Sequence, residues 1–195
     1  NEDGSDGEGK FTGAYVKEPK PGLYKWVYDL DLTSLYPSII MSINISPETK
    51  IGKLKGYSAE QHMKGNLETY SIVDDSGNEF PPLPKEKFLK FIEKNKYSVA
   101  ANGVLYRTDK VGVIPEILSV WFDKRVEYKN LMKKYGKEGN DEQYKFYGKR
   151  QLVQKIMLNS LYGVLGLPSF RFYDVDNAEA TTITGQTVIK TTELI

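Results

Sequence analysis

Apolar and polar side chains alternate in one segment near the N-terminus. Within residues 23–32, four apolar side chains occupy every second position and would share one face of a strand, while Asp29 and Asp31 would share the other face. Pro37 would break the extended segment, and residues 38–43 would follow as a short buried helix. The pattern therefore predicts a strand that carries two carboxylates near its end.

The C-terminal half has the apolar spacing that is typical of long helices. Between Pro115, which suits a first helical position, and Gly136, which suits a helix end, apolar side chains recur every three or four residues. A second helix is predicted from about Asp141 to about Gly166, with Asn140 as its cap. Because a loop of only a few residues separates the two helices, they should form an antiparallel pair.

Shorter patterns predict the remaining elements. Asn102-Gly103 separates two triplets that favour strands, which is a strong signal for a β-hairpin over residues 97–106. Residues 55–95 are harder to assign. The other predicted elements are a loop at 74–78, a short helix at 85–94, a strand at 170–173 and a helix from Ala178 onward.

Composition excludes several classes of chemistry. The 195 residues contain no cysteine and a single histidine, His62. Disulfides, thiol nucleophiles, cysteine-based zinc sites and multi-histidine metal sites are therefore excluded. A Ser-His-Asp triad would depend on His62, which has no partner at an informative spacing. Any chemistry must rest on carboxylates, lysine, arginine, hydroxyls and backbone groups, which are the groups that bind Mg²⁺ and phosphate.

Charge is distributed unevenly, although the formal net charge is +1. Residues 1–9 contain four acids and no base, and they are predicted to be a disordered tail. Residues 123–155 contain ten Lys/Arg against five Asp/Glu, which indicates either an anionic partner or a solvated helix face. No apolar stretch is long enough to predict a membrane span. Because the chain lacks both a starting Met and a signal peptide, we expect it to be a piece of a longer protein.

The first segment with recognisable chemistry covers residues 31–39, with the sequence DLTSLYPSI. Asp31 would end the strand, small hydroxyl residues would follow, and Pro37 would fix the turn. This order places a carboxylate for a hard cation beside backbone N–H groups that can face a phosphate. The segment suggests half of a Mg²⁺-nucleotide site, and an ordinary turn at the end of a strand is the alternative.

The second segment covers residues 155–163, with the sequence KIMLNSLYG. On a helix, Lys155, Asn159, Tyr162 and Gly163 project from one face. That face would offer a cation to a phosphate at one end and bare backbone to a flat base at the other. Packing of the helix into a core is the alternative.

Two further cations, Arg125 and Lys129, are four residues apart on the preceding helix. Like charges at this spacing repel each other by a few tenths of a kcal/mol, about 0.3. A phosphate chain bound between the two cations would turn this repulsion into a net attraction. The alternative is that both residues are ordinary surface charges with no ligand. The sequence leaves both interpretations open.

Together these segments resemble the B-family (α-like) DNA polymerases. Residues 31–39 are similar to motif A of that family, D-x-x-S-L-Y-P-S-I, and residues 155–163 to motif B, K-x-x-x-N-S-x-Y-G. The closer likeness is to the replicative polymerases of T-even-type bacteriophages, and residues 44–49 and 170–174 support it. Residues 13–19 resemble the linker ahead of motif A, with Phe11 in place of the usual leading Tyr.

The resemblance implies an α/β (α+β) fold in which a partial palm sheet carries an antiparallel two-helix fingers hairpin. The palm would cover residues 10–114, with an insertion at about 55–95 where the resemblance is poor. The fingers would cover residues 115–166, and residues 167–195 would return to the palm. The chain would end before motif C.

The resemblance also implies roles for individual residues. Asp31 would be the catalytic carboxylate of this chain and one of two palm aspartates that together bind two Mg²⁺ ions, and the Leu32 carbonyl would be a further metal ligand. The Tyr36 ring would lie under the sugar and exclude a 2′-hydroxyl. The triphosphate would be held by the amides of Ser34, Leu35 and Tyr36 and by Arg125, Lys129 and Lys155. Asn159, Tyr162 and Gly163 would line the nascent base pair, and Gly13 and Ala14 would touch the template strand.

The implied activity is transfer of a nucleotide from a dNTP to a DNA primer, in the cytoplasm of a bacterial host if a phage encodes the protein. Motif C, Y-G-D-T-D-S in the family, is absent from the sequence, so we expect this chain by itself not to polymerise measurably. A second polypeptide carrying motif C and the thumb would complete a split enzyme. The alternatives are a non-catalytic module that binds nucleotides or nucleic acid, and a structural domain whose motifs are idle.

Overall fold

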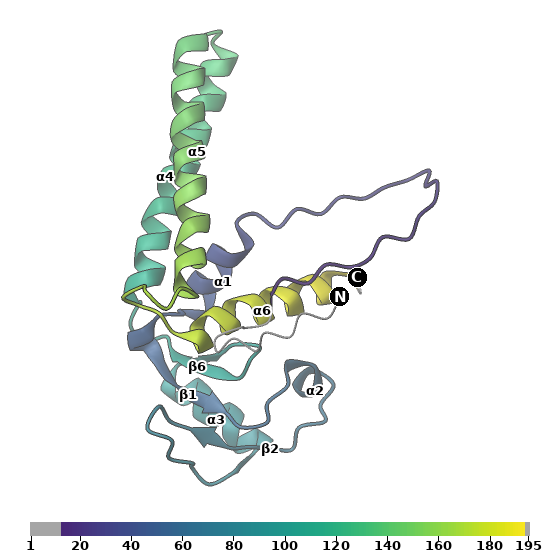
Figure 1. Ribbon diagram of the computed structural model, residues 1–195, viewed down its shortest axis with the longest axis vertical. Coiled ribbons are helices and arrows are strands. Elements are labelled where there is room, and N and C mark those ends of the chain that lie inside the picture. Colours follow the sequence, from purple (N-terminus) through teal and green to yellow (C-terminus); the bar gives the residue numbers. More distant parts are fainter. Residues whose placement is uncertain (1–12, 194–195) are drawn as a thin grey trace.

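The computed structural model describes residues 13–193 (Figure 1). Helices and antiparallel sheets are both present, which confirms an α+β fold. The predicted tail at residues 1–9 lies outside the described residues. The helices are α1 (Leu35–Ile43), α2 (Ala59–Met63), α3 (Lys85–Asn95), α4 (Val113–Lys137), α5 (Asp141–Leu165) and α6 (Val175–Glu193), with a 3₁₀ turn, η1 (Pro47–Thr49). The strands are β1 (Lys50–Leu54), β2 (Thr69–Tyr70), β3 (Ile72–Val73), β4 (Leu83–Pro84), β5 (Tyr97–Val99) and β6 (Val104–Arg107).

The main sheet has four strands in the order β3-β1-β6-β5, and all neighbouring pairs are antiparallel. Strands β5 and β6 form the predicted hairpin, and Gly103 in its turn has a φ of 87°, which glycine adopts without strain. The segment that was hard to assign contributes β3 to this sheet, and it also forms α2, the predicted helix α3 and the small β2–β4 sheet.

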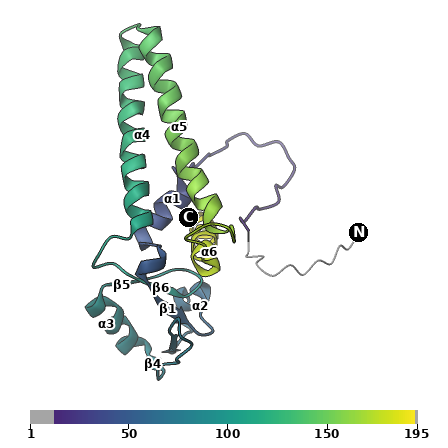
Figure 2. The same cartoon turned by 60° about the vertical axis from the view of Figure 1, so that its left-hand side comes forward.

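Helices α4 and α5 form the predicted antiparallel pair and extend away from the sheet (Figures 1 and 2). The predicted cap of α5 is confirmed, because the Asn140 side chain accepts a hydrogen bond from the Gln143 N–H at 3.1 Å. Helix α4 begins at Val113, so Pro115 lies in its first turn but not at its first position. The predicted ends of this helix, Pro115 and Gly136, thus lie within two residues of the observed ends, Val113 and Lys137.

The beginning of α4 is anchored by the segment that follows α1. The Asn44 amide donates to the carbonyls of Arg107 and Lys110, and its oxygen accepts from the Gly112 N–H at 2.8 Å. The Glu48 carboxylate accepts from the Val113 N–H. These bonds satisfy backbone groups that a helix end leaves without partners, so they fix the base of the α4–α5 hairpin on the body.

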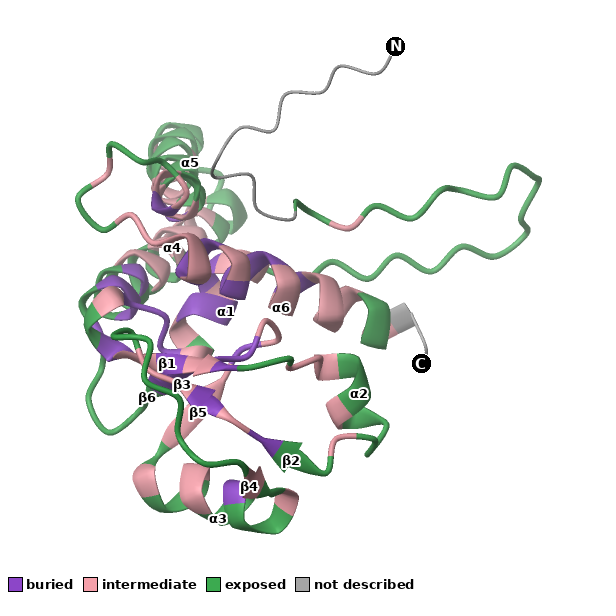
Figure 3. Ribbon diagram, turned by 60° about the horizontal axis from the view of Figure 1, so that its bottom comes forward, coloured by how far each residue is buried: buried purple, intermediate pink, exposed green. Residues whose placement is uncertain are grey.

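Two apolar clusters hold the fold together. The larger one lies where α1, the base of the α4–α5 hairpin, α6 and the β5–β6 hairpin meet, and Ile40, Leu118 and Leu165 are fully buried in it. The smaller one lies between α3 and the strands, where the Tyr70 and Phe88 rings stack at 4.3 Å. Figure 3 shows that burial is concentrated in these regions and that the outer part of the α4–α5 hairpin is mostly exposed.

An ion-pair cluster joins β1 to the beginning of α6. The Lys50 ammonium lies 3.1 Å from a carboxylate oxygen of Asp174 and 2.9 Å from one of Asp176. The Lys53 ammonium lies 2.7 Å from the other oxygen of Asp176. The side chain of Lys50 is only 11% exposed, so this cluster fixes α6 across the sheet under partial exclusion of water.

The strand predicted at residues 23–32 is wrong. Residues 13–32 contain no helix or strand, and beyond the contacts of Gly13 and Tyr15 with α6 the segment loops away from the body (Figure 3), with Trp26 95% exposed. A strand needs a neighbouring backbone to pair its N–H and C=O groups, and the described part of the chain supplies none here. Asp29 and Asp31 therefore share no strand face. The predicted helix at 38–43 is confirmed, but it begins earlier, at Leu35.

The strand predicted at residues 170–173 is also wrong. These residues form consecutive turns, in which Phe170 N–H donates to Leu167 C=O and Tyr173 N–H donates to Phe170 C=O. The Phe170 and Phe172 rings contact each other edge to face at 5.7 Å. The chain must reverse here between α5 and α6, and local turn hydrogen bonds satisfy the backbone without a partner strand.

Candidate functional site

The beginning of α1 brings the first motif against α4. Ser34, the residue before α1, has the left-handed angles φ 51° and ψ 49°, which cost about 1 kcal/mol for a residue with a side chain. Its hydroxyl oxygen accepts a hydrogen bond from Arg125 Nη1 at 2.7 Å. This contact fixes the Arg125 guanidinium beside the N-terminal end of α1, where backbone N–H groups favour an anion.

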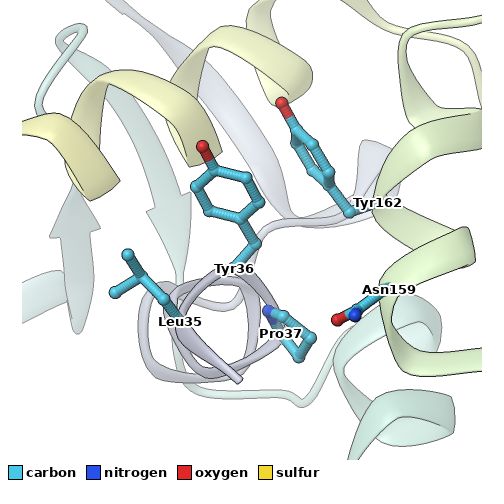
Figure 4. Close-up of a pocket in the computed structure, with 5 residues that line it drawn as sticks. All are labelled: Leu35, Tyr36, Pro37, Asn159 and Tyr162. Carbon is cyan, nitrogen blue, oxygen red and sulfur yellow. The ribbon is translucent and has the colours of Figure 1, made fainter. Parts of the chain in front are cut away.

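A pocket of about 420 Å³ opens between α1 and α5 (Figure 4). Leu35, Tyr36 and Pro37 line it from α1, and Asn159 and Tyr162 line it from α5. Four of these five side chains were predicted from two motifs more than 100 residues apart in the sequence. The volume lies within the range of about 300–1,000 Å³ that small-molecule pockets occupy.

The two tyrosine rings of the pocket contact each other. The Tyr36 and Tyr162 ring centroids are 4.4 Å apart, with the planes tilted by 45°. Burial raises the pKa of both hydroxyls, so both are neutral hydrogen-bonding groups near pH 7. The nearby Thr182 side chain on α6 lowers the pKa of the Tyr162 hydroxyl by less than burial raises it.

Helix α6 packs behind the Tyr36 ring of this pocket and contains residues that the sequence pattern did not indicate. The Thr182 side chain influences the Tyr162 hydroxyl by lowering its pKa, and a Cβ atom at Gly185 would lie 2.8 Å from the Tyr36 ring. The available signal for Gly185 was a glycine inside a helical pattern, which costs about 1 kcal/mol relative to alanine. No local signal could have indicated Thr182.

The three predicted phosphate-binding cations lie on α4 and α5 without ion-pair partners in residues 13–193. Arg125 is partly buried, and its Nε donor has no hydrogen-bond partner among the described residues. Lys129 is partly buried one turn further along α4, and Lys155 is exposed one turn before Asn159. The structure places Arg125 at the first motif and Asn159 in the pocket.

Asp31 and Leu32 lie in the exposed coil just before α1. Their carboxylate and carbonyl oxygens are the hard donors that Mg²⁺ prefers. Among the described residues, however, no group of three or more His, Cys, Asp or Glu side chains could hold a metal ion. The two residues offer donors that suit Mg²⁺ but do not by themselves make a metal site.

Gly163, Gly13 and Ala14 are exposed. A Cβ atom at Gly163 would meet no atom of the described chain within 4 Å, so packing does not explain a glycine inside α5. The Gly13 carbonyl accepts from the Gln186 side chain at 2.5 Å, which places the beginning of the described chain along α6 next to Gly185. No helix in residues 13–193 is long and apolar enough to cross a membrane.

Comparison with known proteins identifies a family. The model of DNA polymerase family B matches residues 1–195. The "DNA-directed DNA polymerase" of Escherichia phage RB69 is 30% identical over 92% of this chain, and that of Enterobacteria phage T4 is 30% identical over 96%. "DNA polymerase 2" of Aeropyrum pernix is 28% identical over 94% of the chain. The chain covers 23% and 24% of the length of the two phage proteins.

Proposed function

Because the chain belongs to DNA polymerase family B, we propose that it is the part of a DNA-directed DNA polymerase that binds the incoming deoxynucleoside triphosphate. The observation that carries this proposal is the pocket in which Tyr36 from one motif meets Asn159 and Tyr162 from the other. In this proposal, residues 10–114 form part of the palm with an insertion at about 55–95. Residues 115–166 are then the fingers, and residues 167–195 return to the palm.

The triphosphate would bind at the N-terminal end of α1. Amides of Ser34, Leu35 and Tyr36 lie at this end, and Arg125 is already held beside it by its bond to Ser34. The Nε donor of Arg125 is buried and has no hydrogen-bond partner among the described residues. Lys129 would extend the same charge along α4, and Lys155 would approach from α5.

The sugar and base would occupy the pocket. The Tyr36 ring would lie under the sugar and exclude a ribose 2′-hydroxyl, while Asn159, Tyr162 and the open backbone of Gly163 would contact the nascent base pair. Gly13 and Ala14 would contact the template strand of the primer-template DNA. The excess of cations on the α4–α5 hairpin supports an anionic partner of this kind.

Asp31 and the Leu32 carbonyl would hold Mg²⁺ together with oxygens of the substrate, two ions being bound in the complete enzyme. When bound, Mg²⁺ would neutralise the triphosphate and lower the pKa of the primer 3′-hydroxyl. Asp31 would be the catalytic carboxylate of this chain. Because one carboxylate makes a weak Mg²⁺ site, we propose that this chain alone binds nucleotide without measurable turnover.

The remaining expectations concern partners and location. The comparisons give no support to a second polypeptide that completes the site. The likeness to phage proteins is the reason to place the activity in the cytoplasm of a bacterial host. A module that binds nucleic acid or nucleotides without being part of a polymerase is the second candidate, and the lack of a metal-binding group of carboxylates among residues 13–193 is the observation that favours it.

The experiment is a titration of the purified chain with a fluorescent dNTP and Mg²⁺. Lys155→Ala should weaken binding at least about tenfold, because a charged hydrogen bond to phosphate contributes about 1.5–3 kcal/mol. Lys149→Ala is the matched control, since Lys149 is also an exposed lysine of α5 but lies nearly two turns from Lys155. Equal affinities of the two variants would contradict the proposed phosphate contact.

A further inference from the structure

Gly185 lies directly behind the ring of Tyr36. A Cβ atom built at this position in α6 would be 2.8 Å from Tyr36 Cε1 and 3.4 Å from Cδ1. It would also be 3.5 Å from Ile39 Cδ1. Carbon atoms in packed side chains approach one another to about 3.5–4.0 Å. The Tyr36 ring therefore occupies a position that only glycine at residue 185 leaves free.

The two glycines inside α5 behave differently, whereas a Cβ atom at Gly136 near the end of α4 would also come close to a ring, 3.1 Å from Tyr144 Cδ2. A Cβ atom at Gly148 in α5 would make an ordinary 3.6 Å contact with the Met132 sulfur, and one at Gly163 would meet nothing within 4 Å. Glycine weakens a helix interior wherever it occurs, so its presence in α6 calls for a local reason. At Gly185, that reason is the close approach of one aromatic ring of the pocket.

The Tyr36 ring is held from two sides. Gly185 and Ile39 lie behind it, and the centroid of the Tyr162 ring lies 4.4 Å from that of Tyr36. Figure 4 shows both rings extending toward α6, with Pro37 and Asn159 on the open side. A side chain at residue 185 would push the Tyr36 ring away from α6 and into the space of the pocket.

We propose that Gly185 is a positioning residue that sets how far the Tyr36 ring projects into the pocket. It thereby determines how strictly the pocket rejects a nucleotide that carries a 2′-hydroxyl. This inference rests on the proposed function, because it takes the ligand to be a nucleoside triphosphate. Gly185 itself does not touch the nucleotide, and its effect passes entirely through Tyr36.

The first test requires no nucleotide. In the chain labelled with 3-fluorotyrosine, the fluorine resonance of Tyr36 is assigned from its loss in Tyr36→Phe. Gly185→Ala should shift that resonance, whereas the control Gly148→Ala should leave it in place. An unmoved Tyr36 resonance in folded Gly185→Ala would overturn the proposal.

The second test compares dissociation constants for dATP and ATP, each measured with Mg²⁺. Gly185→Ala should weaken ATP binding about fivefold more than dATP binding, and Gly148→Ala should leave the ratio unchanged. In a Tyr36→Ala background, Gly185→Ala should no longer alter the ratio. An effect that persists without the Tyr36 ring, or an unchanged ratio in Gly185→Ala itself, would overturn the inference but leave the proposed function intact.

The two proposals fail in distinguishable ways. If the unmodified chain binds neither nucleotide, the proposed function fails, and this inference fails with it. If Gly185→Ala does not fold, the double variant with Tyr36→Ala should fold, because removal of the ring restores the space. A double variant that remains unfolded would show that Gly185 acts on the fold independently of Tyr36, which refutes the positioning role.

Discussion

Lys50 joins β1 to the beginning of α6, and its replacement by methionine is the most informative change to the fold that supports the pocket. Lys50→Met keeps the length of the side chain but leaves the carboxylates of Asp174 and Asp176 facing each other. Among the described lysines and arginines, Lys53 would be the one that still pairs with the Asp176 carboxylate. Because α6 carries Gly185 and Thr182, this cluster also contributes indirectly to the position of the pocket tyrosines.

The magnitude follows from distance and burial. At about 3 Å and an effective dielectric constant of about 20, each pair has a Coulomb attraction of about 5 kcal/mol, most of which is offset by loss of hydration. Removal of one partner from a fully buried pair costs about 3–5 kcal/mol. Here Asp174 and Asp176 keep 23% and 30% exposure. We therefore expect a loss of about 2–3 kcal/mol, or about 5–10 °C in Tm.

The assay is thermal and urea unfolding followed by circular dichroism, with Lys55→Met as the matched control. Lys55 pairs with Glu79 at 2.8 Å, but both side chains are well exposed, so this variant should lose no more than about 0.5 kcal/mol. If Lys50→Met and Lys55→Met lose the same stability, the ion cluster does not fix α6 and the reasoning fails.

The pH dependence provides a second check. Burial would raise the pKa of Asp176, but hydrogen bonds from Lys53 and Lys50 outweigh it and lower the pKa below 3.8. A carboxylate with a lowered pKa stabilises the fold above its ordinary pKa and loses this effect as the pH falls through the lowered value. The difference between the wild-type chain and Lys50→Met should therefore be full at pH 7 and shrink as the pH falls below 3.8.

Three further substitutions test the anchors and the exposed segment. Asn44→Ala removes three hydrogen bonds and should lower the free energy of unfolding by about 3 kcal/mol in urea titrations, and a loss below about 1 kcal/mol would contradict the anchoring of α4. Asn140→Ala should cost about 1 kcal/mol by removing the cap of α5, and an unchanged urea midpoint would contradict that cap. Trp26→Ser should change stability by less than about 0.5 kcal/mol, because Trp26 is 95% exposed, and a larger loss would show that segment 13–32 is packed.

The elements predicted correctly are those with signals inside their own sequence. Asn102-Gly103 indicated the β5–β6 hairpin because a two-residue turn needs residues that tolerate positive φ. Asn140 indicated the start of α5 because a capping side chain acts on the next turn only. The strand predicted at residues 23–32 was wrong because alternation describes a face but supplies no partner backbone.

The sequence predicted which residues belong to the candidate site, but it did not predict how they are arranged in space. Its two motifs indicated Tyr36, Asn159 and Tyr162 through a resemblance, and the structure brings these three around one pocket. The bond from Arg125 to Ser34 joins two further predicted residues. Their roles in binding remain predictions. Gly185 was missed because its importance depends on the position of a ring that is distant in sequence.

The sequence by itself determined the helices of the hairpin, the turn between β5 and β6 and the identity of the polar groups available for chemistry, because helix caps, turns and periodicity act over a few residues. The tertiary structure alone decided that residues 23–32 do not form a strand, that Arg125 reaches Ser34 and that α6 lies behind the tyrosines. These features depend on which segments, distant in the sequence, pack together and exclude water from each other. Such long-range burial leaves no recognisable pattern within a short stretch of sequence.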